Sequence, residues 1–312
     1  MQTRILQPGE IESLAHTSFP RILLPQPQAL FGDRAARLQQ LAEGNPIADY
    51  LRLLARLVQA QKQAASTVQT TPVAPETIAR HQEFSMPLMP ATDHIDPAWQ
   101  KVLAALLDQV QPAAEVPAAL LPTLDTLRQQ TPQALDALAQ RVLSSSLEAS
   151  DLGAAPFVAA ALQVVFADRA SRLDAADVPY TDPGTICPVC ASQPVASVLR
   201  IGGNMAGHRY LHCGVCCTEW HMVRVKCSHC ESTKGIRYQG VEGGSQVVQA
   251  ETCPECHTYR KLVNQEKDPL AEPLADDLGS LLLDLLMGDT DFERASANPL
   301  LALMAPAQDT AA

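Results

Sequence analysis

Four CxxC pairs between Cys187 and Cys256 constrain the fold of this 312-residue chain more than any other feature. They occur in the order CPVC, CGVC, CSHC and CPEC, separated by 22, 10 and 22 residues, so each pair of the first half reappears 40 positions later. A repeat of this length indicates two copies of one small structural unit. Both 22-residue intervals carry a glycine-containing turn between strand-like runs. Each repeat is therefore predicted to be a hairpin closed by two cysteine knuckles.

The cysteines indicate metal binding rather than disulfides. All nine fall within 70 residues. The N-terminal sequence MQTRILQPGE lacks the apolar segment of a secretory signal, so we expect a cytoplasmic protein whose thiols stay reduced. A two-residue spacing lets a tight turn direct both sulfurs at one ion, and a second turn completes a tetrahedron. A single CxxC could be a thioredoxin-type redox motif, but four pairs with repeated spacing favour metal.

The repeat also favours a particular pairing of the motifs. Sequential pairing gives two metal sites, one formed by Cys187, Cys190, Cys213 and Cys216 and the other by Cys227, Cys230, Cys253 and Cys256. An interleaved cross-brace, in which the first and third pairs share an ion, remains open. Tetrahedral four-sulfur sites suit both iron and zinc, so ligand type alone leaves the metal undecided. Zinc would be structural, whereas iron would permit one-electron chemistry of the rubredoxin kind.

Metal should decide whether these small units fold. A ribbon of 40 residues has a core worth about 3 to 5 kcal/mol at best, whereas a structural zinc ion contributes about 10 to 16 kcal/mol in small peptides. We therefore predict that chelation, or Cys→Ser at any paired position, unfolds the affected ribbon while the helical part of the chain survives.

Cys217 is the one cysteine outside the repeat, since the residue 40 positions later is His257. A buried thiol beside a knuckle is the favoured interpretation, because free cysteines are commonly buried. A reactive thiol, or a ligand that replaces Cys216, are the alternatives.

Other polar and aromatic residues near the motifs have ordinary structural interpretations. Five histidines are expected at exposed strand or turn positions rather than as ligands: His208, His212, His221, His229 and His257. Tyr210 and Trp220 are expected to cover the small core of the first ribbon rather than to form a patch for a partner. The carboxylates of residues 266 to 279 are interpreted as helix caps and solvated acids rather than as an acid–base or hard-metal site.

The rest of the chain has helical periodicity. Helices are expected over residues 33 to 43, 47 to 64, 97 to 110, 117 to 130, 132 to 147 and 156 to 173. The apolar run from 152 to 167 is too short to span a bilayer and indicates a buried helix. Residues 66 to 90 are expected to be mostly connection. Strands are expected over residues 195 to 201, 209 to 212, 222 to 225 and 246 to 250.

The helical pattern stops at the turn cluster PYTDPG and returns after Lys267. In the C-terminal helix an apolar face is expected to pack back on another unit, formed by Leu278, Leu281, Leu282, Leu285 and Leu286. The expected fold class is a multidomain α and β protein with a large all-α domain, two small rubredoxin-like or zinc-ribbon-like four-cysteine modules and a C-terminal helix. The expected domains are 1 to 180, 181 to 223, 224 to 266 and 267 to 312.

Charge and missing motifs exclude several functions. A net charge of -11 disfavours nucleic acid and anionic membranes as partners, because both repel an acidic surface. Residues 181 to 268 carry nine Lys/Arg and eight Asp/Glu, so the acidic excess lies in the helical parts. The chain has no GxxxxGK[ST], GxGxxG, HExxH or GxSxG pattern, and we expect no enzymatic activity.

Longer segments resemble one known family. The sequence RYLHCGVCCTEWHMVRVKCSHC at 209 to 230, the CPVC pair and QEKDPLAEPLADDLGSLLLDLLM at 265 to 287 resemble the FdhE family of formate dehydrogenase accessory proteins. The resemblance extends more loosely to residues 34 to 52 and to NPLL at 298 to 301. Two residues depart from the family pattern. Ala191 stands where the knuckle glycine is expected, and Cys217 stands where a residue other than cysteine, often Glu, is expected.

This resemblance implies a function and a metal. It implies a cytoplasmic maturation factor, without direct membrane insertion, that is required for active membrane-associated formate dehydrogenases and binds their catalytic subunit before export. It also implies a helical domain with two rubredoxin-like modules, iron as the metal, and all eight paired cysteines as ligands. A redox protein that passes electrons to its client is the alternative function. A zinc-ribbon nucleic-acid binder, disfavoured by charge, is the third.

Overall fold

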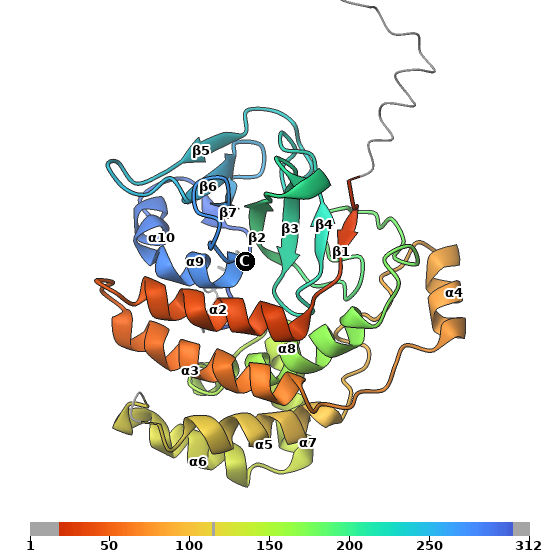
Figure 1. Cartoon of the computed structure of the whole chain (residues 1–312), viewed down its shortest axis with the longest axis vertical. Helices are drawn as coiled ribbons and strands as arrows, with labels where there is room; N and C mark the ends of the chain where they lie inside the picture. The colour runs from red at the N-terminus through yellow and green to blue at the C-terminus, as the bar shows by residue number, and fades with distance from the viewer. Residues whose placement is uncertain (1–18, 114–115, 302–312) are drawn as a thin grey trace, which may run out of the picture.

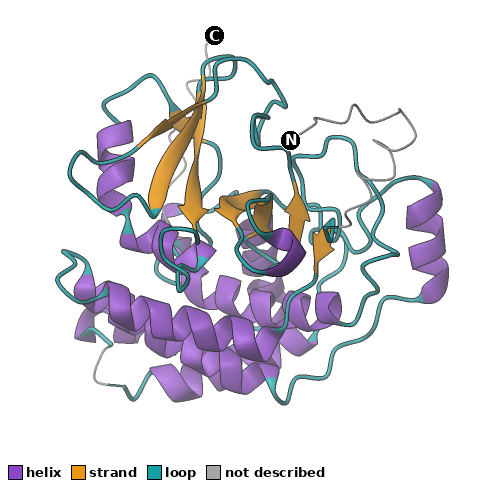
Figure 2. Ribbon diagram, turned by 45° about the horizontal axis from the view of Figure 1, so that its top comes forward, coloured by secondary structure: helices purple, strands orange, loops and turns teal. Residues whose placement is uncertain are grey.

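The computed structural model describes residues 19–113 and 116–301. The absence of a secretory signal was inferred from residues that lie outside this range. Helices and strands form two layers, with a helical bundle below and a sheet above it (Figures 1 and 2). None of the helices in the described ranges combines the length and the apolar character needed to cross a membrane.

The N-terminal region is helical, as predicted. Its helices are α2 (Pro27–Leu41), α3 (Ala48–Ala65), α4 (Pro75–Glu83), α5 (Ala98–Val110), α6 (Leu121–Gln129), α7 (Pro132–Leu143) and α8 (Ala155–Ser171), with short 3-10 turns η1 (Ala118–Leu120) and η2 (Ala149–Asp151). Helix α8 is buried on almost every side, which explains its continuous apolar sequence. The prediction missed α4, because this helix buries no side chain and so has no apolar stripe.

The C-terminal region contains the sheet. Its elements are β1 (Ile22–Leu23), β2 (Pro194–Leu199), η3 (Gly203–Met205), β3 (Arg209–Cys213), β4 (Glu219–His221), β5 (Arg237–Gln239), β6 (Val248–Cys253), β7 (Thr258–Asn264) and β8 (Glu293–Arg294). Within the described residues these strands form one sheet in the order β1-β4-β3-β2-β7-β6-β5, with β8 beside β7. A helical region and a sheet that carries two groups of four cysteines confirm the predicted fold class.

The two repeats are joined and do not form separate ribbons. Strands β2 and β7 pair in parallel, with Ser197 opposite Leu262. An ion pair of 2.9 Å between Arg209 Nη1 and Glu251 Oε1 also links β3 to β6. Each repeat keeps its own group of four cysteines, as the two predicted modules require, and the pairing of β2 with β7 satisfies backbone groups that would otherwise lie at a sheet edge.

One strand was predicted at the wrong residues, and another was not predicted. Residues 222 to 225 lie in a loop, and the strand precedes them as β4, which pairs antiparallel with β3. Strand β7 was missed, although all its residues except the first are buried. Its sequence TYRKLVN places two cations in a row, a pattern typical of an exposed segment. Arg260 and Lys261 are nevertheless buried, with carbonyl and carboxylate partners.

The C-terminal segment forms two short helices instead of the single helix that was predicted. It forms α9 (Pro273–Gly279) and α10 (Leu281–Met287), which are separated at Ser280. Leu278 is buried, but Leu282, Leu285 and Leu286 are exposed. The predicted single apolar face was therefore wrong. The break rotates α10 so that Leu283 and Met287 face the sheet, while α9 packs on α2.

Candidate metal centres

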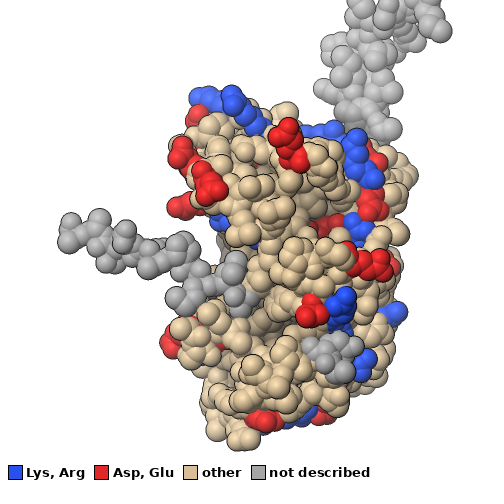
Figure 3. All heavy atoms as spheres, turned by 90° about the vertical axis from the view of Figure 1, so that its left-hand side faces the viewer, with Lys and Arg blue, Asp and Glu red and all other residues tan. Residues whose placement is uncertain are grey.

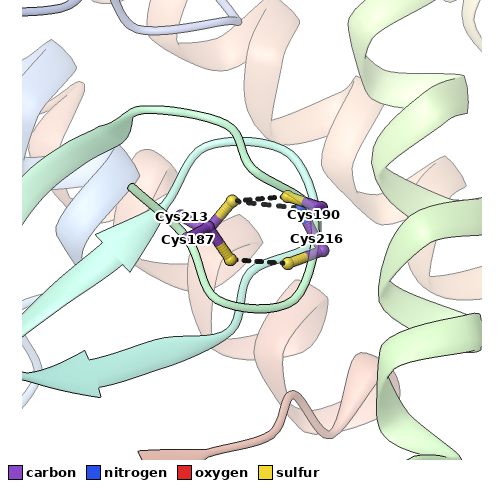
Figure 4. Close-up of side chains that lie close together, drawn as sticks. All are labelled: Cys187, Cys190, Cys213 and Cys216. Atoms are coloured by element: carbon purple, nitrogen blue, oxygen red, sulfur yellow. Dashed lines mark hydrogen bonds between the residues drawn. The ribbon is translucent and has the colours of Figure 1, made fainter. Parts of the chain in front are cut away.

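The first four cysteines of the repeat converge on one point (Figure 4). They are Cys187, Cys190, Cys213 and Cys216, and they come from the turn before β2 and from the turn between β3 and β4. The Sγ atoms of Cys187 and Cys216 are 3.5 Å apart, and those of Cys190 and Cys213 are 3.3 Å apart. All four residues are completely buried.

The second group repeats this arrangement 40 residues later with Cys227, Cys230, Cys253 and Cys256. The Sγ atoms of Cys227 and Cys256 are 3.8 Å apart, and those of Cys230 and Cys253 are 3.7 Å apart. The structure therefore groups the motifs sequentially and not as a cross-brace. No histidine belongs to either group within the described residues.

Both groups fit a tetrahedral metal ion. Four sulfurs bonded at about 2.3 Å to one ion lie about 3.8 Å from one another. The four sulfurs of each group lie within 4.8 Å of one another, and the second group already has the tetrahedral spacing along two edges. Two groups of four thiols can hold two mononuclear ions, and sulfur ligands of this kind suit zinc or iron.

The local backbone also repeats. The residue that follows each CxxC pair has a left-handed conformation, with φ of 64° at Ala191, 59° at Cys217, 63° at Glu231 and 53° at His257. At two of these positions the N–H donates to the carbonyl of the first cysteine of the pair, from Ala191 to Cys187 at 2.9 Å and from Glu231 to Cys227 at 3.2 Å. Glycine adopts the left-handed conformation at little cost, yet none of the four residues is glycine. The strain at Ala191 is thus shared by all four knuckles.

Hydrogen bonds to sulfur occur in both groups. The N–H of Cys216 donates to Cys213 Sγ at 3.4 Å, and the N–H of Cys230 donates to Cys227 Sγ at 3.5 Å. In addition, the Oγ1 atom of Thr218 lies 3.2 Å from Cys216 Sγ, and that of Thr258 lies 3.1 Å from Cys256 Sγ. The backbone N–H donors favour the thiolate form that binds metal.

The helical domain encloses the first group. The N–H groups of Met89 and Ala91 donate to the carbonyls of Val189 and Cys190 at 2.7 and 2.9 Å. From α8, Gln163 Nε2 donates to the Gly214 carbonyl at 2.7 Å. All four cysteines of the first group belong to the main hydrophobic core. Both of its knuckles are therefore held by the domain that was expected to fold independently.

The second group lies at the surface. Cys227 and Cys253 are buried, but Cys256 is half-buried and Cys230 is exposed. None of these four residues belongs to a hydrophobic core cluster. The residues around the last pair, Pro254, Glu255 and His257, are exposed as well. Two sites with the same ligand set thus differ in their access to water.

Burial controls the acidity of several thiols. It raises the pKa of Cys187 and Cys216 well above the ordinary value, and it raises the pKa of Cys227 to about 12. Buried thiolates require a compensating positive charge. A bound divalent ion would supply that charge, and its binding would release protons.

Cys217 lies outside both groups, which excludes it as a substitute for Cys216 in this arrangement. Its thiol is buried, 3.9 Å from Arg34 Nη2, and burial raises its pKa to about 12. These observations support the buried-thiol interpretation. Cys217 also lines a cavity of about 390 Å³ between α2, β4 and the segment before α9.

A polar network beside this cavity was not predicted. His212 Nδ1 lies 2.7 Å from Glu219 Oε1, and Glu219 also forms an ion pair with Arg200. Arg34 Nε donates to Glu272 Oε1 at 3.0 Å. His212 is therefore buried, contrary to the expected exposed position. A strand with one exposed face shows alternating buried and exposed residues, but every residue of β3 is buried. The sequence of β3 therefore did not indicate the burial of His212.

The remaining predictions near the site have mixed outcomes. Tyr210 and Trp220 are buried, as expected, with Trp220 Nε1 donating to the Gly184 carbonyl at 2.9 Å. Glu272 caps α9 by accepting from the Ala275 N–H, also as expected. Asp276 and Asp277 were interpreted as solvated acids. They are instead buried in ion pairs, Asp276 with Arg37 from the distant helix α2 and Asp277 with Arg294 and Lys261 from neighbouring strands.

The fold and site define a class of protein: a helical domain that encloses one of two four-cysteine groups on a single sheet, each of which could hold a metal ion. The chain belongs to the FdhE family. Three family models match it, namely FdhE N-terminal over residues 19–182, FdhE central domain over 186–224 and FdhE C-terminal domain over 225–301.

Individual relatives extend over nearly the whole chain. A protein named FdhE homolog from Cronobacter sakazakii is 38% identical over 309 residues, which cover 96% of this chain and 98% of the relative. Another from Edwardsiella ictaluri is 41% identical over 282 residues, covering 90% and 91%. The crystal structure of the FdhE protein from Pseudomonas aeruginosa is similar with a TM-score of 0.82 and 37% identity, covering 92% of this chain and all of that one. Family identity supports an accessory role for formate dehydrogenase.

Proposed function

We propose that this chain is a non-enzymatic maturation factor that binds the catalytic subunit of a formate dehydrogenase in the cytoplasm, before that subunit is exported. The observation that carries the proposal is membership of the FdhE family over nearly the full length of the chain. Eight cysteines in two groups supply metal sites that fix the sheet. The expected metal is iron, as the family resemblance implies, with zinc as the alternative.

A docking surface for this client is available beside the second metal site. Three large apolar side chains are exposed there, with exposed fractions of 54% for Val223, 60% for Val225 and 43% for Tyr238. Tyr238 Oη donates to the Arg224 carbonyl at 3.1 Å, which places the tyrosine beside the segment that carries both valines, just before Cys227. Exposed apolar side chains that gather in one place are typical of protein-binding sites.

Affinity capture tests this proposal. The tagged chain, expressed while formate dehydrogenase is being made, should retain the catalytic subunit. Val225→Asp should weaken retention at least about tenfold, because it places a charge in the buried part of the interface. Leu285→Asp is the matched control, since Leu285 is 72% exposed but lies on α10. Absence of the subunit from captured wild-type protein would contradict the function. Loss of retention with Leu285→Asp but not with Val225→Asp would contradict the proposed docking surface.

Electron transfer is the second candidate function, and the exposure of Cys230 favours it. An iron ion in the second group could exchange electrons with a client at the surface. Protein isolated with iron should then show a visible thiolate-to-iron absorption band that bleaches reversibly with reductant. Stoichiometric zinc in protein isolated under native conditions would exclude this function.

A further inference from the structure

We infer that the two four-cysteine sites have different tasks: the second is a labile site that exchanges its metal ion with an external thiol ligand, whereas the first holds its ion permanently. The second site therefore binds a divalent metal ion that prefers sulfur ligands. A small molecule or protein with a thiol group delivers this ion or removes it. This inference concerns the metal alone and is independent of the identity of the client.

Access to sulfur is the first reason. An entering ligand must approach the ion between the sulfurs, and in the second group it can do so beside Cys230, which is exposed, and Cys256, which is half-buried. In the first group every cysteine has an exposed fraction of 0%. Exchange at the first group therefore requires the surrounding core to open.

The strength of the enclosure is the second reason. Three backbone or side-chain donors from the helical domain, those of Met89, Ala91 and Gln163, hold the knuckles of the first group. The second group has contacts of its own, in which Arg260 Nε donates to Ser228 Oγ at 2.9 Å and Glu231 Oε1 accepts from the Gly184 N–H at 2.8 Å, but none of its four cysteines belongs to a hydrophobic core cluster. Release from the first group thus requires a larger unfolding event than release from the second.

The exchange is a ligand substitution and involves no oxidant or reductant. As each bond between a cysteine sulfur and the ion breaks, a bond from the entering thiolate to the ion replaces it. Each released cysteine thiolate takes the proton that the entering thiol loses. The ion keeps its oxidation state, and the second group ends as four thiols.

Zinc release from the full chain tests the inference. Protein loaded with two equivalents of zinc is mixed with a chromogenic chelator and excess glutathione. We expect two phases of one equivalent each, with the first on the order of 100-fold faster than the second. Pulsed alkylation followed by peptide mass analysis should show Cys227, Cys230, Cys253 and Cys256 modified in step with the fast phase. Cys187, Cys190, Cys213 and Cys216 should stay protected.

Matched variants assign the phases. Thr258→Val should accelerate the fast phase by about 10-fold or more, because it removes the hydroxyl beside Cys256 Sγ. The same change at the equivalent position, Thr218→Val, should leave the fast phase unchanged. Cys230→Ser should abolish the fast phase and leave the slow one. A single phase of two equivalents, simultaneous alkylation of both groups, or acceleration of the fast phase by Thr218→Val would overturn the inference.

Discussion

At the scale of single residues, the four knuckles carry a conformational cost that the chain could avoid. Ala191, Cys217, Glu231 and His257 all have φ between 53° and 64°. A residue with a Cβ atom is disfavoured there by roughly 1 to 2 kcal/mol. A missing glycine was visible in the sequence at Ala191, but only the structure shows that the same conformation recurs at all four positions.

Ala191→Gly should therefore stabilise the protein by about 0.5 to 1 kcal/mol, since relief of the left-handed conformation outweighs the entropy that glycine adds to the unfolded chain. The control is the same change in a helix: Ala159→Gly in α8 should destabilise by about 1 kcal/mol. Urea unfolding of the metal-loaded variants measures both values. Destabilisation by both substitutions would contradict the conformational account.

Cys217 marks the limit of prediction at this scale. Its departure from the repeat was evident, and burial was the favoured interpretation. Its contact with Arg34 could not be predicted, because 183 residues separate the two and a single sequence carries no signal for such a pair. The contact of His212 was missed for a different reason: its partner Glu219 is close in sequence, but the two face each other only when β3 and β4 pair.

At the scale of elements, buried ion pairs fasten the C-terminal segment to the sheet. Both carboxylate oxygens of Asp277 on α9 accept from Arg294 Nη2 of β8 at 2.6 Å, and one of them also accepts from Asn298 Nδ2 at 2.8 Å. Lys261 Nζ of β7 lies 3.5 Å away. The sequence alone indicated that Asp277 is a solvated acid, because Arg294 and Lys261 come close to it only in the tertiary fold.

Asp277→Ala should destabilise the protein by about 3 kcal/mol, because it removes one of the two carboxylates that pair with the buried cations Lys261 and Arg294 and leaves them only Asp284. Asp289→Ala, at an exposed position in the loop after α10, should change stability by less than about 0.5 kcal/mol. The free energy of unfolding from chemical denaturation decides between them. Equal effects of the two substitutions would show that the buried ion pairs of Asp277 contribute nothing to the free energy of unfolding.

A second ion pair between elements predicts a dependence on pH. Asp151 in η2 accepts from Arg141 Nε and Nη2 of α7 at 2.7 and 2.8 Å, and these hydrogen bonds lower the pKa of Asp151. A lowered folded-state pKa stabilises the protein fully above the ordinary carboxyl value of about 4, and this stabilisation is lost as pH falls through the folded value.

Asp151→Asn should consequently be less stable than the wild type at pH 7, and the difference should shrink below about pH 4. Comparison with the wild type at each pH cancels the effect of metal loss in acid. Asp49→Asn serves as the control, since the Asp49 side chain is 98% exposed, and its difference should stay near zero. Urea midpoints from pH 7 to 3 test this. A difference for Asp151→Asn that is constant with pH would refute it.

Element boundaries were predictable where periodicity was strong. The helix expected at 47 to 64 is Ala48–Ala65, and that at 97 to 110 is Ala98–Val110, because both bury a clear apolar stripe. Strand β7 and the broken C-terminal helix were not predictable in this way. Their burial depends on partners from other elements, namely β2 for the strand and α2 for α9.

At the scale of the whole molecule, the parts are less independent than a repeat suggests. The sheet runs through both repeats, takes β1 from the N-terminal region and rests on the helices (Figure 1). On the face shown in Figure 3, charged side chains of both signs are scattered among uncharged surface. Such a mixed surface gives no sign of a strong field that would attract nucleic acid.

This continuity changes the expected effect of metal loss. Cys253→Ser should loosen the second repeat alone and leave the helical signal in circular dichroism almost unchanged. Cys213→Ser, the equivalent change in the first group, should also lower the stability of the helical region, because α8 and residues 88 to 91 pack on that site. Limited proteolysis mapped by mass spectrometry distinguishes the two. Proteolysis confined to the substituted repeat in both variants would show that the repeats fold independently of the helical region.

We propose that the eight cysteines form two mononuclear metal sites paired in sequence. Metal analysis joined to X-ray absorption spectroscopy of natively isolated protein tests it most directly. Two ions per chain are predicted, each with four sulfur neighbours at about 2.3 Å and no second metal nearby. Cys227→Ser should remove one ion and Cys190→Ser the other. Fewer than two ions, nitrogen or oxygen ligands in the first shell of both sites, or a metal–metal distance typical of a cluster would contradict the account.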